Sequence, residues 1–274
     1  MNDQFQEKPD KNIFGIIGGS GFYDFLLNPE KEIIETPFGS TILYSSKIEN
    51  KQVYFLNRHG IQHSVPPHQI NYKANIFALW KKGVDFIIST SAVGVLKQYE
   101  PSDIVILEQF VDFVSPPITF FDGKFELILH NGLKKSGVIH TDFTDPYCPL
   151  LRSKIKENEK IINLTIKEGG IYILSRGPRF ETPAEIKIIT KNNWGNVVGM
   201  TNPPEVILAR ELEMHYAAIG IVTNYAAGLS ERKITHTEVL ELFDRLKPKI
   251  KVLLNETIIK FPKHPTCDCI KYPK

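Results

Sequence analysis

Short runs of apolar residues recur along this chain, and each run is bounded by Gly, Pro or Asp residues. Runs of this length and setting are typical of strands buried in a sheet. The predicted strands cover residues 13–17, 53–56, 86–88, 104–107, 171–174, 197–198 and 217–222. Longer segments with helical spacing of apolar residues cover residues 71–82, 183–193, 203–214 and 237–261. Because strands and helices alternate, the sequence predicts an α/β layer structure around a largely buried central sheet.

The chain has 274 residues, a length that fits one or two domains. No low-complexity stretch or repeat divides it, so we expect one domain over residues 13–262. An extension of residues 1–12 precedes this domain, and a tail of residues 263–274 follows it. Hydrophobic residues make up 42% and charged residues 23%, values that are typical of a globular chain and argue against long disorder or a coiled coil.

The charges nearly cancel, because 33 Lys and Arg residues stand against 31 Asp and Glu residues for a net charge of +2. Neither sign forms a long block, so we expect neither nucleic acid nor a membrane surface as a partner. The first residues carry Asp, Glu and Pro where a secretion signal needs a basic start and an apolar run. Apolar stretches stay well short of the roughly 18 residues of a membrane helix. We therefore expect a cytoplasmic protein.

The first predicted strand ends in Gly18-Gly19-Ser20-Gly21. Glycines allow backbone N–H groups to approach a ligand closely, and the serine hydroxyl adds a donor, so this segment can cradle an anion. A tight turn after a strand explains the same residues equally well. The third glycine of a dinucleotide-binding G-x-G-x-x-G pattern is missing, and no Gly-Lys-Ser/Thr follows as in a P-loop.

Three other loops offer ligands for an anion. Arg58 follows a predicted strand within the segment NRHG, and a guanidinium can grip an oxyanion through two parallel donors. Ser91 and Thr201 add hydroxyls in the segments STSAVG and GMT. If the sheet is parallel at its centre, these strand ends face one crevice, where one phosphate would satisfy them together. Taken alone, Arg58 fits equally well as a solvent-facing residue before a turn.

Two further segments carry polar side chains in apolar surroundings. They are GPRFET, with Phe180 and Glu181, and VTNYAAG, with Asn224. A phenylalanine beside a glutamate, together with an asparagine at the end of a buried strand, suits a planar heterocycle that is both stacked and hydrogen-bonded. A glutamate that caps a helix and an asparagine in a turn are the structural alternatives.

These segments occur with others in an order that resembles one known family. The segments are GIIGGSGFYD, NRHGIQH, NYKANIFALW, STSAVG, HTDFTDPYCP, GPRFET, GMTNPPE and VTNYAAG, spread over about residues 13 to 260. The chain resembles purine nucleoside phosphorylases and methylthioadenosine phosphorylases. The resemblance implies a single α/β domain whose central mixed, twisted sheet is flanked by helices, the nucleoside phosphorylase fold. It also implies phosphate-dependent cleavage of a purine N-glycosidic bond in trimers or hexamers, without cofactor or metal.

Residues carried over by position from this family divide into a phosphate site and a nucleoside site. The phosphate site would comprise Ser20, Arg58, His59, Ser91, Ala92 and Thr201. Met200 would lie beneath the ribose, Phe180 would pack on the base, and Thr223 with Asn224 would line the base-binding strand end. His140 matches a residue that a neighbouring subunit lends to the 5′ end of the sugar.

The chain departs from the methylthioadenosine phosphorylase pattern at the base and the sugar. That pattern has two aspartates in a T-D-Y-D segment, whereas this chain has Asn224 and Ala226. Glu181 replaces a small hydroxyl residue, and His236 replaces a small or apolar one. These departures resemble the 6-oxopurine nucleoside phosphorylases.

Hydrogen-bond chemistry links these departures to the substrate. Hypoxanthine and guanine present O6 as acceptor and N1–H as donor, so Glu181 can accept from N1–H while the Asn224 amide donates to O6. Adenine would leave the Glu181 carboxylate without its donor, at a cost of about 1 to 3 kcal/mol. The Asn224 carbonyl would accept from a protonated N7 and stabilise the leaving purine, which makes Asn224 the catalytic residue. His236 can bond a 5′-hydroxyl, which a methylthio group cannot reciprocate.

We therefore expect cleavage of inosine and guanosine by phosphate to a free purine and ribose 1-phosphate. Methylthioadenosine or methylthioinosine phosphorylase is the alternative within the family, because most of the chain resembles that branch. A nucleoside hydrolase would instead need a carboxylate or a metal to activate water, and no phosphate cradle.

The tail contains Cys267-Asp268-Cys269, and Cys148 is the third cysteine of the chain. Some archaeal methylthioadenosine phosphorylases carry a similar Cys-x-Cys linked to stability, so a disulfide or redox pair is one interpretation and an exposed tail with two thiols is the other. Zinc is disfavoured because two cysteines fall short of tetrahedral spacing, even if His264 adds a ligand. The sequence therefore predicts a peripheral tail and no metal site.

Overall fold

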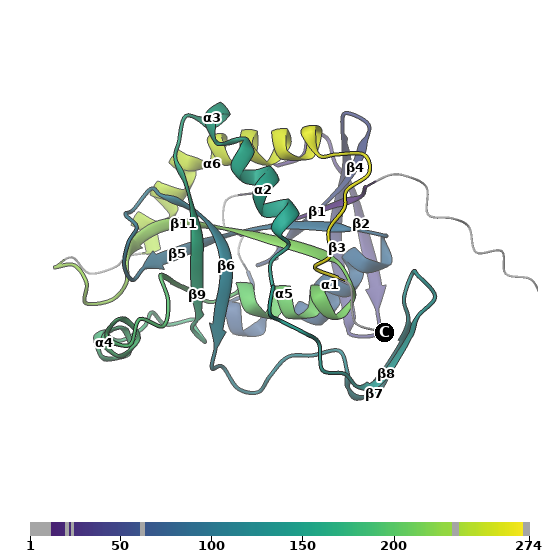
Figure 1. The fold of residues 1–274 in the computed structure, drawn as a ribbon, viewed down its shortest axis with the longest axis horizontal. Helices are drawn as coiled ribbons and strands as arrows, with labels where there is room; N and C mark the ends of the chain where they lie inside the picture. Colours follow the sequence, from purple (N-terminus) through teal and green to yellow (C-terminus); the bar gives the residue numbers. More distant parts are fainter. Residues whose placement is uncertain (1–11, 20–21, 23–24, 61–63, 232–235, 271–274) are drawn as a thin grey trace, which may run out of the picture.

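A mixed sheet of nine strands forms the centre of the molecule, and helices cover both of its faces (Figure 1). The computed structural model describes residues 12–19, 22, 25–60, 64–231 and 236–270. The strands of this sheet are β1 (Phe14–Gly18), β2 (Glu30–Thr36), β3 (Gly39–Ile48), β4 (Lys51–Asn57), β5 (Phe86–Val95), β6 (Ile104–Asp112), β9 (Ile166–Leu174), β10 (Val197–Gly199) and β11 (His215–Tyr225). A separate hairpin comprises β7 (Asp122–Ile128) and β8 (Lys134–Val138). The predicted mixed α/β class is confirmed.

The described helices are α1 (Tyr72–Lys81), α2 (Pro149–Glu157), α3 (Glu159–Ile162), α4 (Pro183–Lys191), α5 (Asn202–Glu211) and α6 (His236–Lys260). All of them except α4, which packs through Ile186 on a small separate cluster, form two layers (Figure 1). Helices α2, α3 and α6 lie on one face of the sheet, and α1 and α5 lie on the other (Figure 1). Side chains alternate along β11, so that Ala218 and Val222 pack toward α1 and α5 while Ala217, Ile219 and Ile221 pack toward α6.

The strand order places four loop-bearing strand ends together. The order is β10-β9-β6-β11-β5-β1-β4-β3-β2, and within it β11, β5, β1 and β4 run parallel to one another. Their carboxyl ends therefore meet at one edge of the sheet, as the sequence predicts. Strand β10 also pairs antiparallel with β5, with Val197 opposite Val95 and Val198 opposite Gly94, which closes five strands into a ring. The loop after β10 thus reaches the same edge from the opposite direction.

Every predicted strand and helix is present, but several differ in extent. Strand β5 runs to Val95 and β11 to Tyr225, so Ser91 and Asn224 lie within strands and not in the loops after them. The pattern missed β2, because the segment EKEIIET is an edge strand with one buried residue, Ile34. It also missed β3, the hairpin of β7 and β8, the short α3, and α2, whose buried side chains are only Leu151 and Ile155. Among the described residues, no helix combines the length and apolar character needed to span a membrane.

Candidate active site

A cavity of about 350 Å³ opens at the shared edge of the parallel strands. Most of the predicted site residues line it: Arg58, His59, Ser91, Ala92, Phe180, Glu181, Met200, Thr201, Thr223 and Asn224. Gly19 lines it as well, whereas Ser20 and the side chain of His236 lie outside the described residues. Ala226 is buried in a small core cluster with Ile186 of α4 and is not part of the lining. His140 is exposed and lies outside this lining.

The guanidinium of Arg58 is buried at one end of the cavity and paired with Glu205 of α5. Its Nε and Nη2 donate to the two carboxylate oxygens of Glu205 at 2.5 and 2.9 Å, and Nη2 also donates to Ser89 Oγ at 2.6 Å. Nη1 donates to the carbonyl oxygen of Thr90 at 2.8 Å. Burial lowers the pKa of Arg58, but the facing Glu205 carboxylate more than offsets it, so the pKa lies above its ordinary value and the guanidinium keeps its charge.

This pairing changes the role expected of Arg58. The sequence predicts that its two parallel donors grip phosphate, but in the structure they hold Glu205. A guanidinium has five N–H groups, and one on Nη1 remains after these bonds. Gly19 lies next to it, and a side chain there would start 3.2 Å from Nη1. A single N–H of Arg58 therefore remains for a ligand in the cavity that this residue lines.

Tyrosine and asparagine side chains extend this buried network into the sheet. Tyr216 of β11 donates to Glu205 Oε2 at 2.7 Å, and Asn202 donates to the Tyr216 hydroxyl oxygen at 3.0 Å. Tyr147 donates in turn to Asn202 Oδ1. Burial raises the pKa of Tyr216 and of Tyr147 well above the usual tyrosine value, so both remain hydroxyl donors. The network fixes α5 against β11.

Two buried hydroxyls face each other beside Arg58. Ser91 Oγ of β5 and Thr201 Oγ1 lie 3.5 Å apart. Thr201 stands at the N-terminus of α5, but its side chain makes no capping bond there, and its backbone N–H donates to the Tyr172 hydroxyl at 3.1 Å. The ring of the nearby His59 is held by a hydrogen bond between its Nδ1 and the carbonyl oxygen of Val65, which lie 2.9 Å apart. Because that oxygen can only accept, Nδ1 carries the hydrogen.

The opposite end of the cavity presents the amide of Asn224. Its Oδ1 accepts from Thr223 Oγ1 at 2.9 Å, and its Nδ2 donates to the Tyr225 carbonyl at 2.8 Å. An amide oxygen has two lone pairs and an NH₂ has two hydrogens, so each half can make a further bond. Gly94 leaves space for the amide, because a Cβ there would lie 3.2 Å from Nδ2. The amide is therefore held in place with bonding capacity toward a planar ligand.

Glu181 is not the capping residue of the helix that follows it. Helix α4 is capped by Thr182, whose hydroxyl accepts from the Glu185 N–H while the Glu185 side chain accepts from the Thr182 N–H. Arg179 also pairs with Glu185, at 2.8 and 2.9 Å, and these bonds lower the pKa of Glu185 to about 2. Glu185, and not Glu181, therefore takes part in the cap of α4. Glu181 is half-buried and lines the cavity beside Phe180.

The comparisons with known proteins agree with this geometry. The sequence profile of the phosphorylase superfamily matches residues 13–259. The chain belongs to this superfamily. The 6-oxopurine nucleoside phosphorylase of Pyrococcus furiosus is 46% identical to it, over 93% of this chain and 95% of the relative. A probable 6-oxopurine nucleoside phosphorylase of Dictyoglomus turgidum is 49% identical, over 93% of this chain and 94% of the relative.

Other members of the superfamily carry different names. A probable S-methyl-5′-thioinosine phosphorylase of Methanopyrus kandleri is 43% identical, over 93% of this chain and 95% of the relative. Among solved structures, the methylthioadenosine phosphorylase of Schistosoma mansoni in complex with adenine has a TM-score of 0.82 at 30% identity and covers 91% of both chains. The resemblance and the fold predicted from the sequence motifs are thereby confirmed.

Two parts of this phosphorylase site are absent from the sequence prediction. The sequence prediction does not include Glu205, although a carboxylate inside the apolar segment PPEVILA indicates a buried charge that needs a partner. Val239 of α6 lines the cavity, with Pro66 and Pro67 on another side. Apolar and proline residues of this kind carry no signal in sequence, because they are the same residues that fill any core.

Glu205→Gln should destabilise the protein by about 3 to 5 kcal/mol, because the buried Arg58 would keep its charge without a counter-charge. The free energy of unfolding from urea denaturation measures this loss. Glu126→Gln is the matched control, since Glu126 pairs with Lys134 at an exposed position and should contribute less than about 1 kcal/mol. Equal stability of the two variants would contradict the structural role given to the Arg58–Glu205 pair.

Proposed function

We propose that this protein is a 6-oxopurine nucleoside phosphorylase, which cleaves inosine and guanosine with inorganic phosphate to the free purine and ribose 1-phosphate. The observation that carries the proposal is the joint presence of Glu181 and Asn224 in one cavity with the buried Ser91–Thr201 hydroxyl pair. The names of the Pyrococcus furiosus and Dictyoglomus turgidum relatives support it.

Phosphate would bind between the two hydroxyls, close to Arg58. Ser91 and Thr201 can each donate to a phosphate oxygen, and the remaining N–H of Arg58 adds a charge-assisted bond. The ion pair with Glu205 leaves the pocket with less net positive charge than a lone arginine would give. Phosphate is the nucleophile here, and a pocket with less positive charge suits an anion that must first bind and then react. The protein's task is to hold it against the anomeric carbon.

The purine would lie at the Asn224 end of the cavity, where Phe180 can cover it. Glu181 would accept a hydrogen bond from N1–H, and the Asn224 NH₂ would donate to O6. As the glycosidic bond breaks, negative charge grows on the purine. N7 takes up, through water, the proton that the phosphate gives up as it forms ribose 1-phosphate, and the bond from N7–H to Asn224 Oδ1 then strengthens. This contact stabilises the transition state more than the bound nucleoside, so Asn224 would be catalytic. Neither a covalent intermediate nor a cofactor takes part in these steps, and phosphate is a co-substrate.

Methylthioinosine phosphorylase is the second candidate, and the Methanopyrus kandleri relative favours it. Methylthioinosine carries the same 6-oxopurine, so Glu181 and Asn224 accept it as readily as inosine and disfavour only the 6-aminopurines. The difference lies at the 5′ end of the sugar. Helix α6 begins at His236, and its Val239 lines the cavity, which supports our proposal that His236 selects a 5′-hydroxyl.

Ser91→Ala should raise the phosphate KM about 10- to 100-fold, the effect of removing one hydrogen bond to a charged group. The KM for inosine should change much less, because the nucleoside lies further along the cavity. Ser153→Ala, on the exposed face of α2, is the matched control and should leave both values unchanged. Initial rates at varied phosphate and inosine concentrations separate the two constants. Purine release that continues undiminished in phosphate-free buffer would show a hydrolase and refute the proposal.

Inosine and guanosine should exceed adenosine in kcat/KM by about 10²-fold, because adenine leaves the Glu181 carboxylate unpaired. Glu181→Gln should reduce this preference to within about tenfold, since a glutamine amide can accept or donate at the same position. Glu157→Gln, an exposed residue of α2, is the control. Competition assays with the three nucleosides measure the ratios. A wild-type preference for adenosine would overturn this assignment of the base pocket.

The oligomeric state also stays a prediction: a trimer, or a dimer of trimers, in the cytoplasm. His140 is exposed and does not line the cavity of its own chain, as a residue lent to a neighbouring site would be. His140→Ala should therefore lower kcat/KM for inosine while leaving the assembly intact, which analytical ultracentrifugation and steady-state kinetics together test. A fully active monomer would rule out the shared site.

A further inference from the structure

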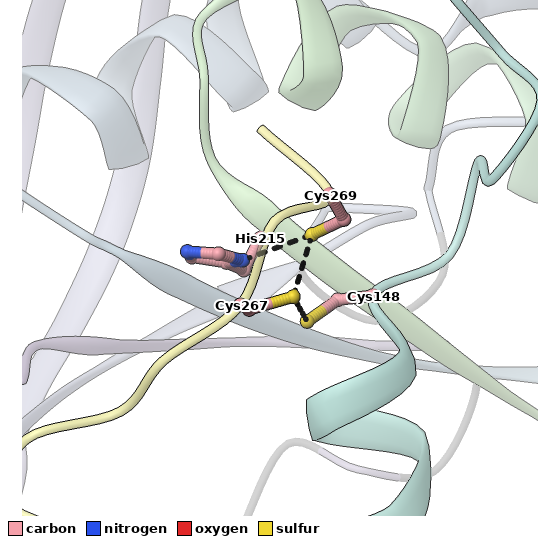
Figure 2. A group of neighbouring side chains, drawn as sticks. All are labelled: Cys148, His215, Cys267 and Cys269. Carbon is pink, nitrogen blue, oxygen red and sulfur yellow. Dashed lines mark hydrogen bonds between the residues drawn. The ribbon is translucent and has the colours of Figure 1, made fainter. Parts of the chain in front are cut away.

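Four side chains from three distant parts of the chain meet beside the first residue of β11 (Figure 2). Cys148 precedes α2, His215 begins β11, and Cys267 and Cys269 belong to the C-terminal tail. The Sγ atoms of Cys148 and Cys267 lie 3.5 Å apart, and those of Cys267 and Cys269 lie 3.2 Å apart. His215 Nδ1 lies 3.2 Å from Cys269 Sγ, and all four ligand atoms are within 4.8 Å of one another.

The surrounding structure orients the two members that come from outside the tail. Cys148 is fully buried, its backbone N–H donates to the Tyr216 carbonyl at 2.8 Å, and its Sγ accepts from the Leu151 N–H at 3.5 Å. The His215 ring stacks on Phe86, with the ring centroids 4.7 Å apart and the planes 10° from parallel. Both groups thus present a ligand atom in a fixed direction, as preformed metal ligands do.

We propose that this cluster is a structural zinc site, with three cysteine sulfurs and His215 Nδ1 as its ligands. Three cysteines and one histidine form one of the ordinary closed, tetrahedral zinc ligand sets. With Zn–S bonds of roughly 2.3 Å, the sulfurs of a tetrahedral site lie about 3.7 Å apart, close to the separations of 3.2 and 3.5 Å found here. Hard cations such as Ca²⁺ and Mg²⁺ do not fit, because the set contains no oxygen ligand.

Zinc binding would replace the protons of the thiols, which are released to solvent. A thiolate is the form of cysteine that coordinates a metal, so each of the three sulfurs would give up its proton when the ion binds.

The ion would join segments that are far apart in sequence. Cys148 and Cys267 are separated by 119 positions, and His215 and Cys269 by 54. A cross-link of this span restricts the unfolded chain and anchors the tail to the sheet. The site is remote from the catalytic end of β11, because Asn224 lies nine residues beyond His215, about 30 Å along the strand at roughly 3.3 Å per residue. The ion would therefore stabilise the fold without entering catalysis.

The first experiment uses the full chain, freed of metal by a chelator in the presence of a reductant. Zn²⁺ added in a calorimeter should bind at one ion per chain, and near a hundredfold excess over Kd it should raise the Tm by about 5 to 10 °C. Co²⁺ should give the visible absorption of a tetrahedral ion, with sulfur-to-metal charge-transfer bands. Failure of the reduced protein to bind either metal would overturn the proposal.

Variants assign the ligands. Cys267→Ser with Cys269→Ser should abolish the charge-transfer bands and the zinc-dependent rise in Tm, and His215→Ala should weaken zinc binding at least tenfold. His264→Ala, which removes a tail histidine outside the cluster, should bind zinc as the wild type does. Circular dichroism checks that each variant is folded, and cleavage of inosine should stay within about twofold of wild type in the double cysteine variant.

Two outcomes would contradict the assignment. Zinc uptake by the folded double cysteine variant equal to that of the wild type would place the ion elsewhere. A chain isolated without reductant whose mass is lower by two hydrogens, and which takes up no zinc after reduction, would show that the cysteines serve as a disulfide pair. Both outcomes leave the proposed phosphorolysis untouched, because that activity is measured at the other end of β11.

Discussion

The buried ion pair between Arg58 and Glu205 is the constraint on which the site depends. Two charges without access to water need a full set of partners, and here Ser89, Thr90 and Tyr216 complete the set. Satisfying them fixes the end of β4, the middle of β5, helix α5 and strand β11 relative to one another. The positions of the Ser91 and Thr201 hydroxyls follow, because Ser91 lies two residues beyond Ser89 and Thr201 begins α5.

The closure of five strands into a ring has a further consequence for the site. Parallel strands alone would bring the loops after β1, β4 and β11 to one edge, but they would not bring Thr201 there. Strand β10 does so because it runs antiparallel to the end of β5, which carries the loop after β10 back toward Ser91. The cavity is therefore lined both by residues of β5 and β11 and by residues 198–201, which come from β10 and the loop after it.

Strand β11 separates the two kinds of site in this molecule. Its carboxyl end carries Thr223 and Asn224, whose polar groups retain bonding capacity for a ligand. Its amino end carries His215, which meets three cysteines over the hydrophobic core. Between them lie buried residues packed between two helix layers. A rigid strand of this kind lets the tail be anchored at one end without distorting the cavity at the other.

The alternating α/β order follows from the sequence alone, because strand and helix periodicities are local patterns. The resemblance of the motifs to a known family adds the family and most of the cavity lining. The sequence did not determine which groups accept the hydrogen bonds of Arg58, because Glu205, which accepts two of them, lies 147 positions away. It predicted a peripheral tail and no metal site around Cys267 and Cys269, since His264 alone could add a ligand to that pair. The folded structure brings Cys148 and His215 to that pair. Because Cys148 precedes a helix and His215 begins a strand, both far from the tail in sequence, the four residues have no recognisable metal-binding spacing in the chain. Secondary structure depends on residues that are neighbours in the sequence, whereas the pairing of buried charges and thiols depends on which distant segments the folded sheet places side by side.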